Sequence, residues 1–222
     1  MAKLNFTIQG VQQVAGAFSQ FIEPYKEFDK QLRNIGTLGV KNFEEFRNAA
    51  IDVAVKVPDT VAGVTEAVYN AISSGAIEVK DGFADVEGGM KFIEVASKLA
   101  VAGLTDTNSA VQSLAANLNA YGESTEAAER YSDILFNTVN KGVTTIPELN
   151  ATLANVIPTA AAFGVKFEEV SAAIAAMTLQ GEMTGTATTK IRQALVELSK
   201  PGEQLKKIMQ EAGVSLDSLK TE

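Results

Sequence analysis

Apolar residues recur at every third or fourth position along most of this chain, and glycine repeatedly interrupts the pattern. Residues at this spacing share one face of an α-helix, so each run predicts a helix with one buried stripe. A period of two, typical of a strand, occurs only where Leu4, Phe6 and Ile8 alternate with polar residues, and it predicts one short N-terminal strand. The clearest helical runs are Val111, Leu114, Leu118 and Tyr121; Tyr131, Ile134, Leu135 and Val139; Phe167, Val170, Ile174 and Met177; and Ile191, Ala194, Leu195 and Leu198.

The glycines that interrupt these runs share a local sequence, in which an aliphatic residue and then a polar residue follow the glycine. We expect each glycine to adopt the left-handed conformation that closes a helix, and each aliphatic residue to pack back against that helix. Thr145 with Glu148 fits a capping box for the next helix, and Asn42 with Glu45 fits a similar cap. The five corners are Gly39-Val40, Gly103-Leu104, Gly142-Val143, Gly164-Val165 and Gly213-Val214.

These signals predict an all-α fold, a compact multi-helix domain of about nine or ten short helices with glycine corners. The gaps between the glycines are unequal, so a repeat of fixed period, and hence a solenoid, is not implied. The long connection at 73–89, SSGAIEVKDGFADVEGG, is read as irregular and as a hinge or contact loop. Helices are expected near 11–34 (bent at Pro24), 42–55, 60–74, 86–101, 107–121, 125–140, 146–162 (bent at Pro158), 167–180, 186–199 and 202–211, with another beginning at 215.

The chain contains no His and no Cys. Disulfides and thiolate metal sites are therefore excluded, and so are the Ser-His and Cys-His catalytic pairs and the usual general base. No Asp-rich loop has the alternating oxygen ligands of a calcium site. We expect no enzymatic activity and no cofactor, and we identify no catalytic, cofactor-binding or metal-binding residues.

The formal net charge of -8 argues against tight nucleic-acid binding that is independent of base sequence, because such binding needs clustered Lys and Arg. The acidic excess is concentrated between residues 44 and 94. A solvated acidic face is the favoured interpretation, and a docking face for a basic partner is the alternative. The ten acids of this stretch are Glu44, Glu45, Asp52, Asp59, Glu66, Glu78, Asp81, Asp85, Glu87 and Glu94.

Residues 181–190, GEMTGTATTK, look superficially like a phosphate-binding loop. In such a loop the Lys directly follows the second Gly, whereas here it lies five residues beyond Gly185. The better interpretation is a helix that ends at Gly181, with Thr184 or Thr186 capping the next one.

Adjacent carboxylates occur at Glu44-Glu45 and at Glu168-Glu169. Neighbouring side chains on a helix point about 100° apart, so neither pair can share a proton or bracket a bond. Both pairs fit the first turn of a helix, where the helix dipole favours acids. A glycan-cleaving site built on one Glu needs no His, but no acid here is distinguished from the others.

The N-terminus, MAKLNFTIQG, lacks the apolar stretch of a signal peptide. The least polar window, 149–165, falls short of the roughly 20 apolar residues that a membrane-spanning helix needs. We expect no membrane span in this segment.

Several stretches resemble the core region of phage tail tape measure proteins, in that family's order and from about residue 35 to 219. Two features depart from the family's pattern: 77–89 resembles a small insertion, and Lys166 stands where the family often has a capping Ser. The stretches that carry the resemblance are AVYNAISSG (67–75), FIEVASKLAVAGLTD (92–106), LNAYG (118–122), YSDILFNTVNKGVTTIPEL (131–149), LANVIPTAAAFGVKFEEVSAAIAAMTLQG (153–181) and TATTKIRQALVELSKP (186–201).

The resemblance implies a structural role in the virion and no known catalytic residue. Tape measure proteins lie in the tail tube of long-tailed phages, set its length during assembly and leave ahead of the DNA. The implied partners are the tube, tail-tip hub or baseplate proteins and further copies in a trimer or hexamer. The implied locations are the tube lumen or tail tip and, during assembly, the host cytoplasm. A helical interaction module unrelated to tails and a wall-cleaving accessory domain remain the alternatives.

A molecular ruler must be long and straight, and this chain is neither. Gly or Pro interrupts every predicted helix within roughly 17 residues, and no heptad pattern is sustained over three repeats. We therefore expect a strand and bent helix at 1–34, and at 35–222 the core helical domain of a longer tape measure chain. Alanine-rich second faces, as in 157–164 and 171–177, would let its helices pack on two sides, which favours docking and oligomerisation.

Overall fold

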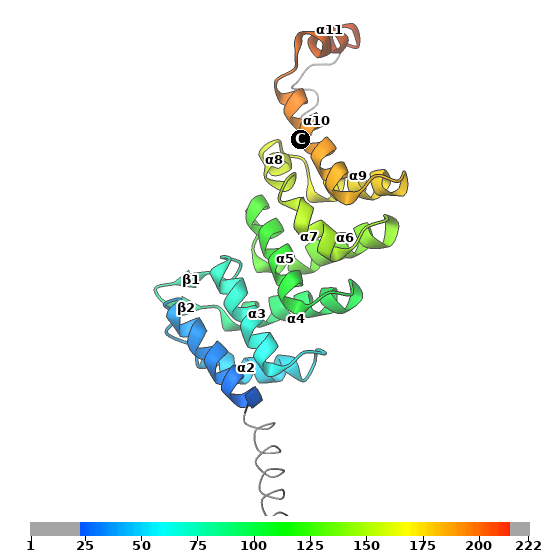
Figure 1. The fold of residues 1–222 in the computed structure, drawn as a ribbon. Helices are drawn as coiled ribbons and strands as arrows, with labels where there is room; N and C mark the ends of the chain where they lie inside the picture. Colours follow the sequence, from blue (N-terminus) through cyan, green and yellow to red (C-terminus); the bar gives the residue numbers. More distant parts are fainter. Residues whose placement is uncertain (1–22, 214–222) are drawn as a thin grey trace, which may run out of the picture.

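The computed structural model describes residues 23–213, and within them the predicted all-α fold is confirmed (Figure 1). The expected strand at Leu4, Phe6 and Ile8, the first half of the helix predicted at 11–34, and the helix from 215 lie outside the described residues. A first helix covers 23–37 and is followed by α2 Glu45–Ala54, α3 Val61–Ser73, β1 Val79–Lys80, β2 Phe83–Ala84, α4 Val86–Ala102, α5 Thr107–Tyr121, a 3-10 turn Thr125–Ala127, α6 Ala128–Lys141, α7 Ile146–Leu153, α8 Ile157–Ala162, α9 Phe167–Leu179, α10 Thr184–Ser199 and α11 Glu203–Glu211.

One helix that was predicted as continuous is interrupted in the structure. The segment 146–162 forms two helices, α7 and α8, where one bent helix was expected. Pro158 lies in the first turn of α8 and has no N–H to donate to the end of α7, so the helix stops at Ala154 and a new one begins.

The helices stack in two rows (Figure 1). In the first row α2, α4, α6 and α9 each pack on the next, and in the second row α3, α5, the α7–α8 pair and α10 do the same. Each first-row helix is joined to the following second-row helix, so the stack is a series of helical hairpins that contact mainly their neighbours. The unequal glycine spacing in the sequence did not predict this stack of hairpins. The connections at the edges of the stack differ in length, although the hairpins pack in a regular order.

The connections lie along two opposite edges of the stack (Figure 1). We call one the short-loop edge, where each first-row helix turns into its second-row partner. We call the other the hairpin edge, because it carries the β1–β2 hairpin and the turns 122–127 and 163–166. The short-loop edge consists of the loops 55–60, 103–106, 142–145 and 180–183.

The glycine corners follow this division. Gly39, Gly164 and Gly213 have positive φ, as predicted. Gly103 (φ -93) and Gly142 (φ -110), both on the short-loop edge, do not, so the prediction of a left-handed conformation is wrong there.

At these two corners a glycine is needed because the next hairpin packs directly on the backbone. A Cβ at Gly103 would overlap Ile146, and one at Gly142 would lie 2.8 Å from Thr178 Oγ1 and 3.0 Å from Ala175 Cα.

The aliphatic residues after the glycines divide in the same way. Val40 is buried and Val165 packs partly against the core, as predicted. Leu104 and Val143, however, are 93% and 67% exposed, so the prediction that they pack back is wrong. The close contact of each short-loop glycine with the next hairpin leaves the following side chain in solvent.

The predicted helix cap at Thr145 is confirmed, whereas those at Asn42 and at Thr184 or Thr186 are wrong. Thr145 and Glu148 form the predicted capping box: Glu148 N–H donates to Thr145 Oγ1 (3.3 Å), and Thr145 N–H donates to Glu148 Oε2 (3.2 Å). Asn42 does not cap α2, because its amide binds the β-hairpin described below.

The turn between α9 and α10 ends a helix at Gly181 (φ 91), as predicted. Neither Thr184 nor Thr186 caps α10, however, because Met183 occupies the capping position and α10 begins at Thr184. The Thr184 hydroxyl is buried and donates to Thr144 Oγ1 at 2.8 Å. This threonine therefore ties α10 to the loop before α7.

An aromatic cluster joins α5, α6 and α9 inside the stack. Tyr131 and Phe167 stack with ring centroids 5.1 Å apart, and Tyr121 lies 6.1 Å from each. Their burial confirms the predicted stripes on these helices. The stripe on α10 is only partly buried, because the end of α10 extends beyond the stack (Figure 1).

Candidate functional site

The segment 73–89 is a structured feature, so the prediction of an irregular connection is wrong. Val79 pairs with Ala84 in a two-stranded antiparallel hairpin. The two-residue turn consists of Asp81 (φ 55) and Gly82 (φ 85). Positive φ at both residues is typical of the tight turns that match the twist of a β-hairpin, and Asp-Gly favours them.

The hairpin is fixed to the turn before α2. The Asn42 side chain accepts a hydrogen bond from Ala84 N–H and donates one to Ala84 C=O, each at 3.0 Å, as a neighbouring strand would. Lys41 N–H donates to the Gly82 carbonyl (2.6 Å), and the Lys41 ammonium lies 5.5 Å from the centre of the Phe83 ring. These contacts attach the hairpin to the turn before α2.

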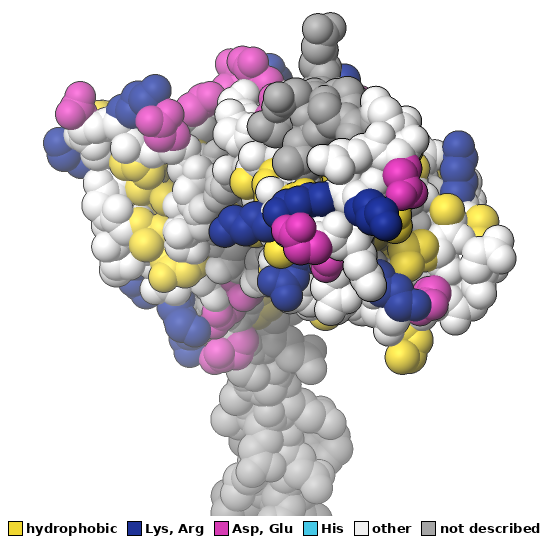
Figure 2. All heavy atoms as spheres, turned by 90° about the horizontal axis from the view of Figure 1, so that it is seen from above, with side chains coloured by type: hydrophobic (Ala, Val, Ile, Leu, Met, Phe, Trp, Pro, Cys, Tyr) yellow, Lys and Arg dark blue, Asp and Glu magenta, His cyan; other side chains and the backbone are white. Residues whose placement is uncertain are grey.

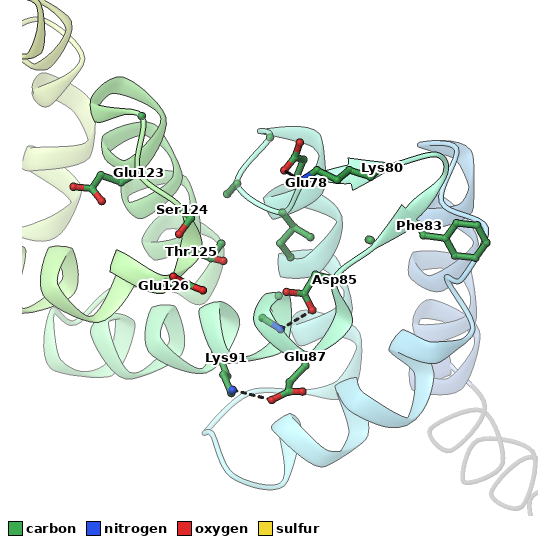
Figure 3. A pocket seen from close by; sticks show the side chains of 17 residues that line it. Glu78, Lys80, Phe83, Asp85, Glu87, Lys91, Glu123, Ser124, Thr125 and Glu126 are labelled. Atoms are coloured by element: carbon green, nitrogen blue, oxygen red, sulfur yellow. Dashed lines mark hydrogen bonds and ion pairs between the residues drawn. The ribbon is translucent and has the colours of Figure 1, made fainter.

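A groove of about 840 Å³ lies between this hairpin and the turn at 122–126 (Figure 3). Ala76 and Ile77 contribute apolar surface to it, and the beginning of α4 also lines it. A Cβ at Gly89 would lie 2.7 Å from Ile77 Cδ1, so glycine there lets α4 approach the hairpin closely. We call this feature the acidic groove.

The acidic groove carries five carboxylates, Glu78, Asp85, Glu87, Glu123 and Glu126, against two lysines (Figure 3). Both lysines already pair with groove carboxylates: Lys80 with Glu78 at 3.0 Å and Lys91 with Glu87 at 2.8 Å. The hydrogen bond that the Lys91 ammonium donates to Glu87 raises the pKa of Lys91. The groove therefore presents an excess of negative charge.

Two of the remaining carboxylates also have structural contacts. Asp85 Oδ1 accepts a hydrogen bond from Gly88 N–H (3.1 Å) and caps α4. Glu123 pairs with Arg130 at 2.7 Å, and Arg130 also reaches Glu168 at 2.9 Å. These contacts leave each carboxylate with acceptor capacity for an incoming donor, because an ionised carboxylate offers about four lone-pair positions.

The acids of the stretch 44–94 are distributed over α2, α3, the hairpin and α4. The structure brings Glu78, Asp85 and Glu87 together in the groove, while Glu94 pairs with Lys98 on α4 at 2.9 Å and its pKa is lowered by that hydrogen bond. Sequence reasoning missed Glu123 and Glu126, which come from a turn far along the chain.

The adjacent carboxylates have structural roles at helix starts, as predicted. Glu44 lies just before α2 and pairs with Arg47 at 2.9 Å. Glu169 accepts a hydrogen bond from the Lys166 backbone N–H at 2.9 Å, so α9 is capped without the expected Ser hydroxyl. Within the phosphate-loop lookalike, Lys190 pairs with Glu182 on the surface.

Among residues 23–213, no three acidic side chains converge in a way that could hold a metal ion. In the same part of the chain no helix is both long and apolar enough to cross a membrane. The acidic groove places its carboxylates beside the apolar surface of Ala76 and Ile77.

The profile of the phage-related minor tail protein family matches residues 47–222. The chain is 37% identical to a probable tape measure protein of Clostridium phage phiCD119, over 72% of this chain and 16% of that protein. It is 26% identical to the tape measure protein of Pneumococcus phage Dp-1, over 85% of this chain and again 16% of that protein. No solved structure matches the chain. These matches confirm the resemblance predicted from the sequence, and the chain spans about a sixth of the length of these relatives.

Proposed function

The chain belongs to the phage-related minor tail protein family, and on that premise we propose that it is a helical docking domain of a tape measure protein. In this role the whole protein sets the length of the tail during assembly and leaves ahead of the DNA at ejection. The similarity to two tape measure proteins, each far longer than this chain, supports the proposal. The role is structural, and clearing of peptidoglycan by the purified chain in a zymogram would contradict it.

The dimensions of the helices support docking rather than measuring. The longest of the labelled helices is α4, with 17 residues, which corresponds to about 26 Å. Successive helices reverse direction, so the stack does not extend as a rod. We assign length measurement to other parts of the tape measure protein and attachment to this domain.

The acidic groove is the observation that carries the docking proposal. A hairpin held by hydrogen bonds forms one wall, Ala76 and Ile77 add apolar surface, and carboxylates outnumber lysines in the lining. We propose that the acidic groove binds a basic segment of a protein of the tube end, the tail-tip hub or the baseplate. Complementary charge steers such an association and fixes its orientation. The domain then lies in the virion, within the tube or at its tip, after assembly in the host cytoplasm.

Rotational symmetry of a tail tube favours several copies of the domain around one axis, and we propose a trimer or hexamer. The exposed alanines of α9, Ala172 and Ala176, offer small side chains on the face opposite its buried stripe. Such a face permits close packing of a neighbouring copy. Cryo-electron microscopy of intact tails tests this arrangement, and density for one isolated copy without tail-protein contacts would contradict it.

Charge reversal in the phage tests the groove itself. Glu78→Lys combined with Glu126→Lys should reduce the yield of assembled tails, because a basic segment would then be repelled. Asp133→Lys, an exposed acid on α6 outside the groove, is the matched control and should assemble normally. Normal tails from the double variant would overturn the groove as the docking site. Absence of the chain from purified tails would overturn the tail role itself.

A further inference from the structure

A pocket of about 280 Å³ lies in the second row of helices, between α5 and the α7–α8 pair (Figure 1). Leu153 and Ile157 in its lining are buried, whereas Ala116 and Pro158 are exposed, so the pocket opens to solvent beside the latter two. The residues that line it are all different from those of the acidic groove. We call this second site the α5–α8 pocket.

Two polar side chains in the lining of the α5–α8 pocket each have one buried atom without a partner. Within the described part of the chain, neither the Ser113 hydroxyl nor Asn150 Oδ1 forms a hydrogen bond. Ser113 is only 4% exposed. Buried polar atoms are nearly always hydrogen-bonded, because an unpartnered one has lost its bonds to water without compensation. Two such atoms in the lining of one pocket favour a pocket that receives a hydrogen-bonding group from another molecule.

The neighbouring hydrogen bonds keep these two groups unpartnered. Asn150 Nδ2 donates to the Ser109 carbonyl at 2.8 Å, so turning the amide over would place its oxygen against that carbonyl oxygen. The same carbonyl accepts the helix N–H of Ser113, which leaves no lone pair for the Ser113 hydroxyl, although a helical serine usually donates there. The pocket therefore offers one acceptor, Asn150 Oδ1, and one hydroxyl that can donate or accept.

The lining selects a neutral ligand with an apolar body. Charged side chains of both signs are spread over the surface seen from above (Figure 2), whereas none of the described residues that line the pocket carries a charge. A charged group would lose its hydration here without a counter-charge. Leu153 and Ile157 supply alkyl surface, and Asn150 Oδ1 requires a donor. A hydroxyl group on a compact apolar body meets these conditions.

A phenol combines these properties in one rigid group. Its ring has few rotatable bonds to order on binding, and its hydroxyl can donate to Asn150 Oδ1 and accept from Ser113. The volume of about 280 Å³ is small for a ligand pocket, which suits one ring rather than a larger molecule. We propose that the α5–α8 pocket binds a neutral phenol, which is either the side chain of a tyrosine of another protein or a free phenolic molecule.

Three small molecules of similar shape test the chemistry. The probes are 4-methylphenol, 4-methylanisole, whose ether oxygen cannot donate, and toluene, which has no oxygen. In NMR titrations of the chain, amide shifts at 113–117 and 150–154 should saturate with 4-methylphenol. Its binding should be at least about ten-fold tighter than that of the other two, because a site that hydrogen-bonds a hydroxyl rejects analogues without the donor. Equal binding of all three would overturn the proposal, and so would the absence of saturable binding of 4-methylphenol, which would leave a pocket for water only.

Substitutions then locate the binding. Ser113→Ala should weaken binding of 4-methylphenol by about ten-fold without lowering the unfolding temperature, because it removes an unpartnered hydroxyl and adds a strong helix former. Ala116→Leu fills the mouth of the pocket from an exposed position and should abolish binding. Ala172→Leu, at an exposed alanine of α9 outside the pocket, is the matched control and should leave binding unchanged. Full binding by either pocket variant would overturn the proposal.

A tyrosine derivative distinguishes the two sources of the phenol. Saturable binding of N-acetyl-tyrosinamide, at least about ten-fold tighter than that of N-acetyl-phenylalaninamide, would identify the tyrosine of another protein as the occupant. Rejection of N-acetyl-tyrosinamide by a pocket that binds 4-methylphenol would identify a free phenolic molecule, because the peptide groups then do not fit at the mouth.

Discussion

Val143 N–H donates a hydrogen bond to Thr178 Oγ1 across the junction of two successive hairpins, at 3.0 Å. The contact is possible because Gly142, beside it, has no side chain: a Cβ there would lie 2.8 Å from the same hydroxyl oxygen. The corner at Gly142 therefore closes by contact between hairpins, and the left-handed backbone expected from the sequence is not used.

This contact predicts how Gly142 responds to substitution. Gly142→Val should destabilise the fold by about 3 kcal/mol, because the added atoms overlap α9, whereas Thr144→Ala should cost about 1 kcal/mol for one lost hydrogen-bonding group. Urea unfolding measures both. Gly142→Asn should be as harmful as Gly142→Val, while Gly164→Asn should be mild, because Asn tolerates the left-handed conformation that Gly164 adopts and Gly142 does not. A mild effect of Gly142→Asn would contradict the packing explanation.

Asp106 provides a second test, at a cap of α5. Its carboxylate accepts hydrogen bonds from Ser109 N–H (2.8 Å) and from the Ser109 hydroxyl (2.6 Å), which lower the pKa of Asp106. A lowered folded-state pKa stabilises the fold above the unfolded pKa of about 3.9, and this contribution is lost as the pH falls through the folded value.

Asp106→Ala should therefore cost about 1 kcal/mol at neutral pH. The difference from the unchanged chain should shrink below about pH 4, as the carboxyl becomes protonated. Thermal unfolding at a series of pH values checks this. A difference that stays constant down to the acid limit would show that Asp106 acts through its size rather than its charge.

The buried tyrosines predict a change at the other end of the pH scale. Burial raises the pKa of Tyr121 and of Tyr131 to about 12. An unfolded Tyr ionises near pH 10, so the stability from burying the neutral phenols is complete below about pH 10 and is lost as the pH rises toward 12.

Phenolate absorbance should accordingly show a late group, Tyr121 and Tyr131, that ionises toward pH 12. Tyr131→Phe should remove part of the late group. Ionisation of Tyr121 and Tyr131 near pH 10 while the helical circular dichroism persists would contradict the burial of this aromatic cluster.

The helix positions could be predicted because their signals are local. The spacing of Val111, Leu114 and Leu118 and the glycines between helices do not depend on distant residues, and these side chains are buried as expected. The short hairpin also had a local signal, Asp81-Gly82, which lay unused within a stretch interpreted as irregular.

The corners and the groove could not be predicted in the same way, since both depend on which hairpins become neighbours. Whether a glycine corner is left-handed depends on what packs against it: Gly142 meets Thr178, while Gly164 meets nothing within 4 Å of its missing Cβ. The groove likewise needs Glu123 and Glu126 opposite Glu78, a juxtaposition created only by stacking.

The final prediction concerns Asn42, which holds the wall of the acidic groove. Asn42→Ala leaves the N–H and C=O of Ala84 without their partners, and Ala84 is buried, so the loss should be about 1–3 kcal/mol for each group left unsatisfied. Amide exchange at Ala84 should accelerate, while exchange in α5 and α6 keeps its protection unless the whole chain unfolds. Asn137→Ala, an exposed position on α6, is the matched control and should change neither. If the groove docks a tail partner, Asn42→Ala should also lower the yield of assembled tails although no groove carboxylate has changed. Unaltered exchange at Ala84 would show that the side chain of Asn42 does not fix the hairpin.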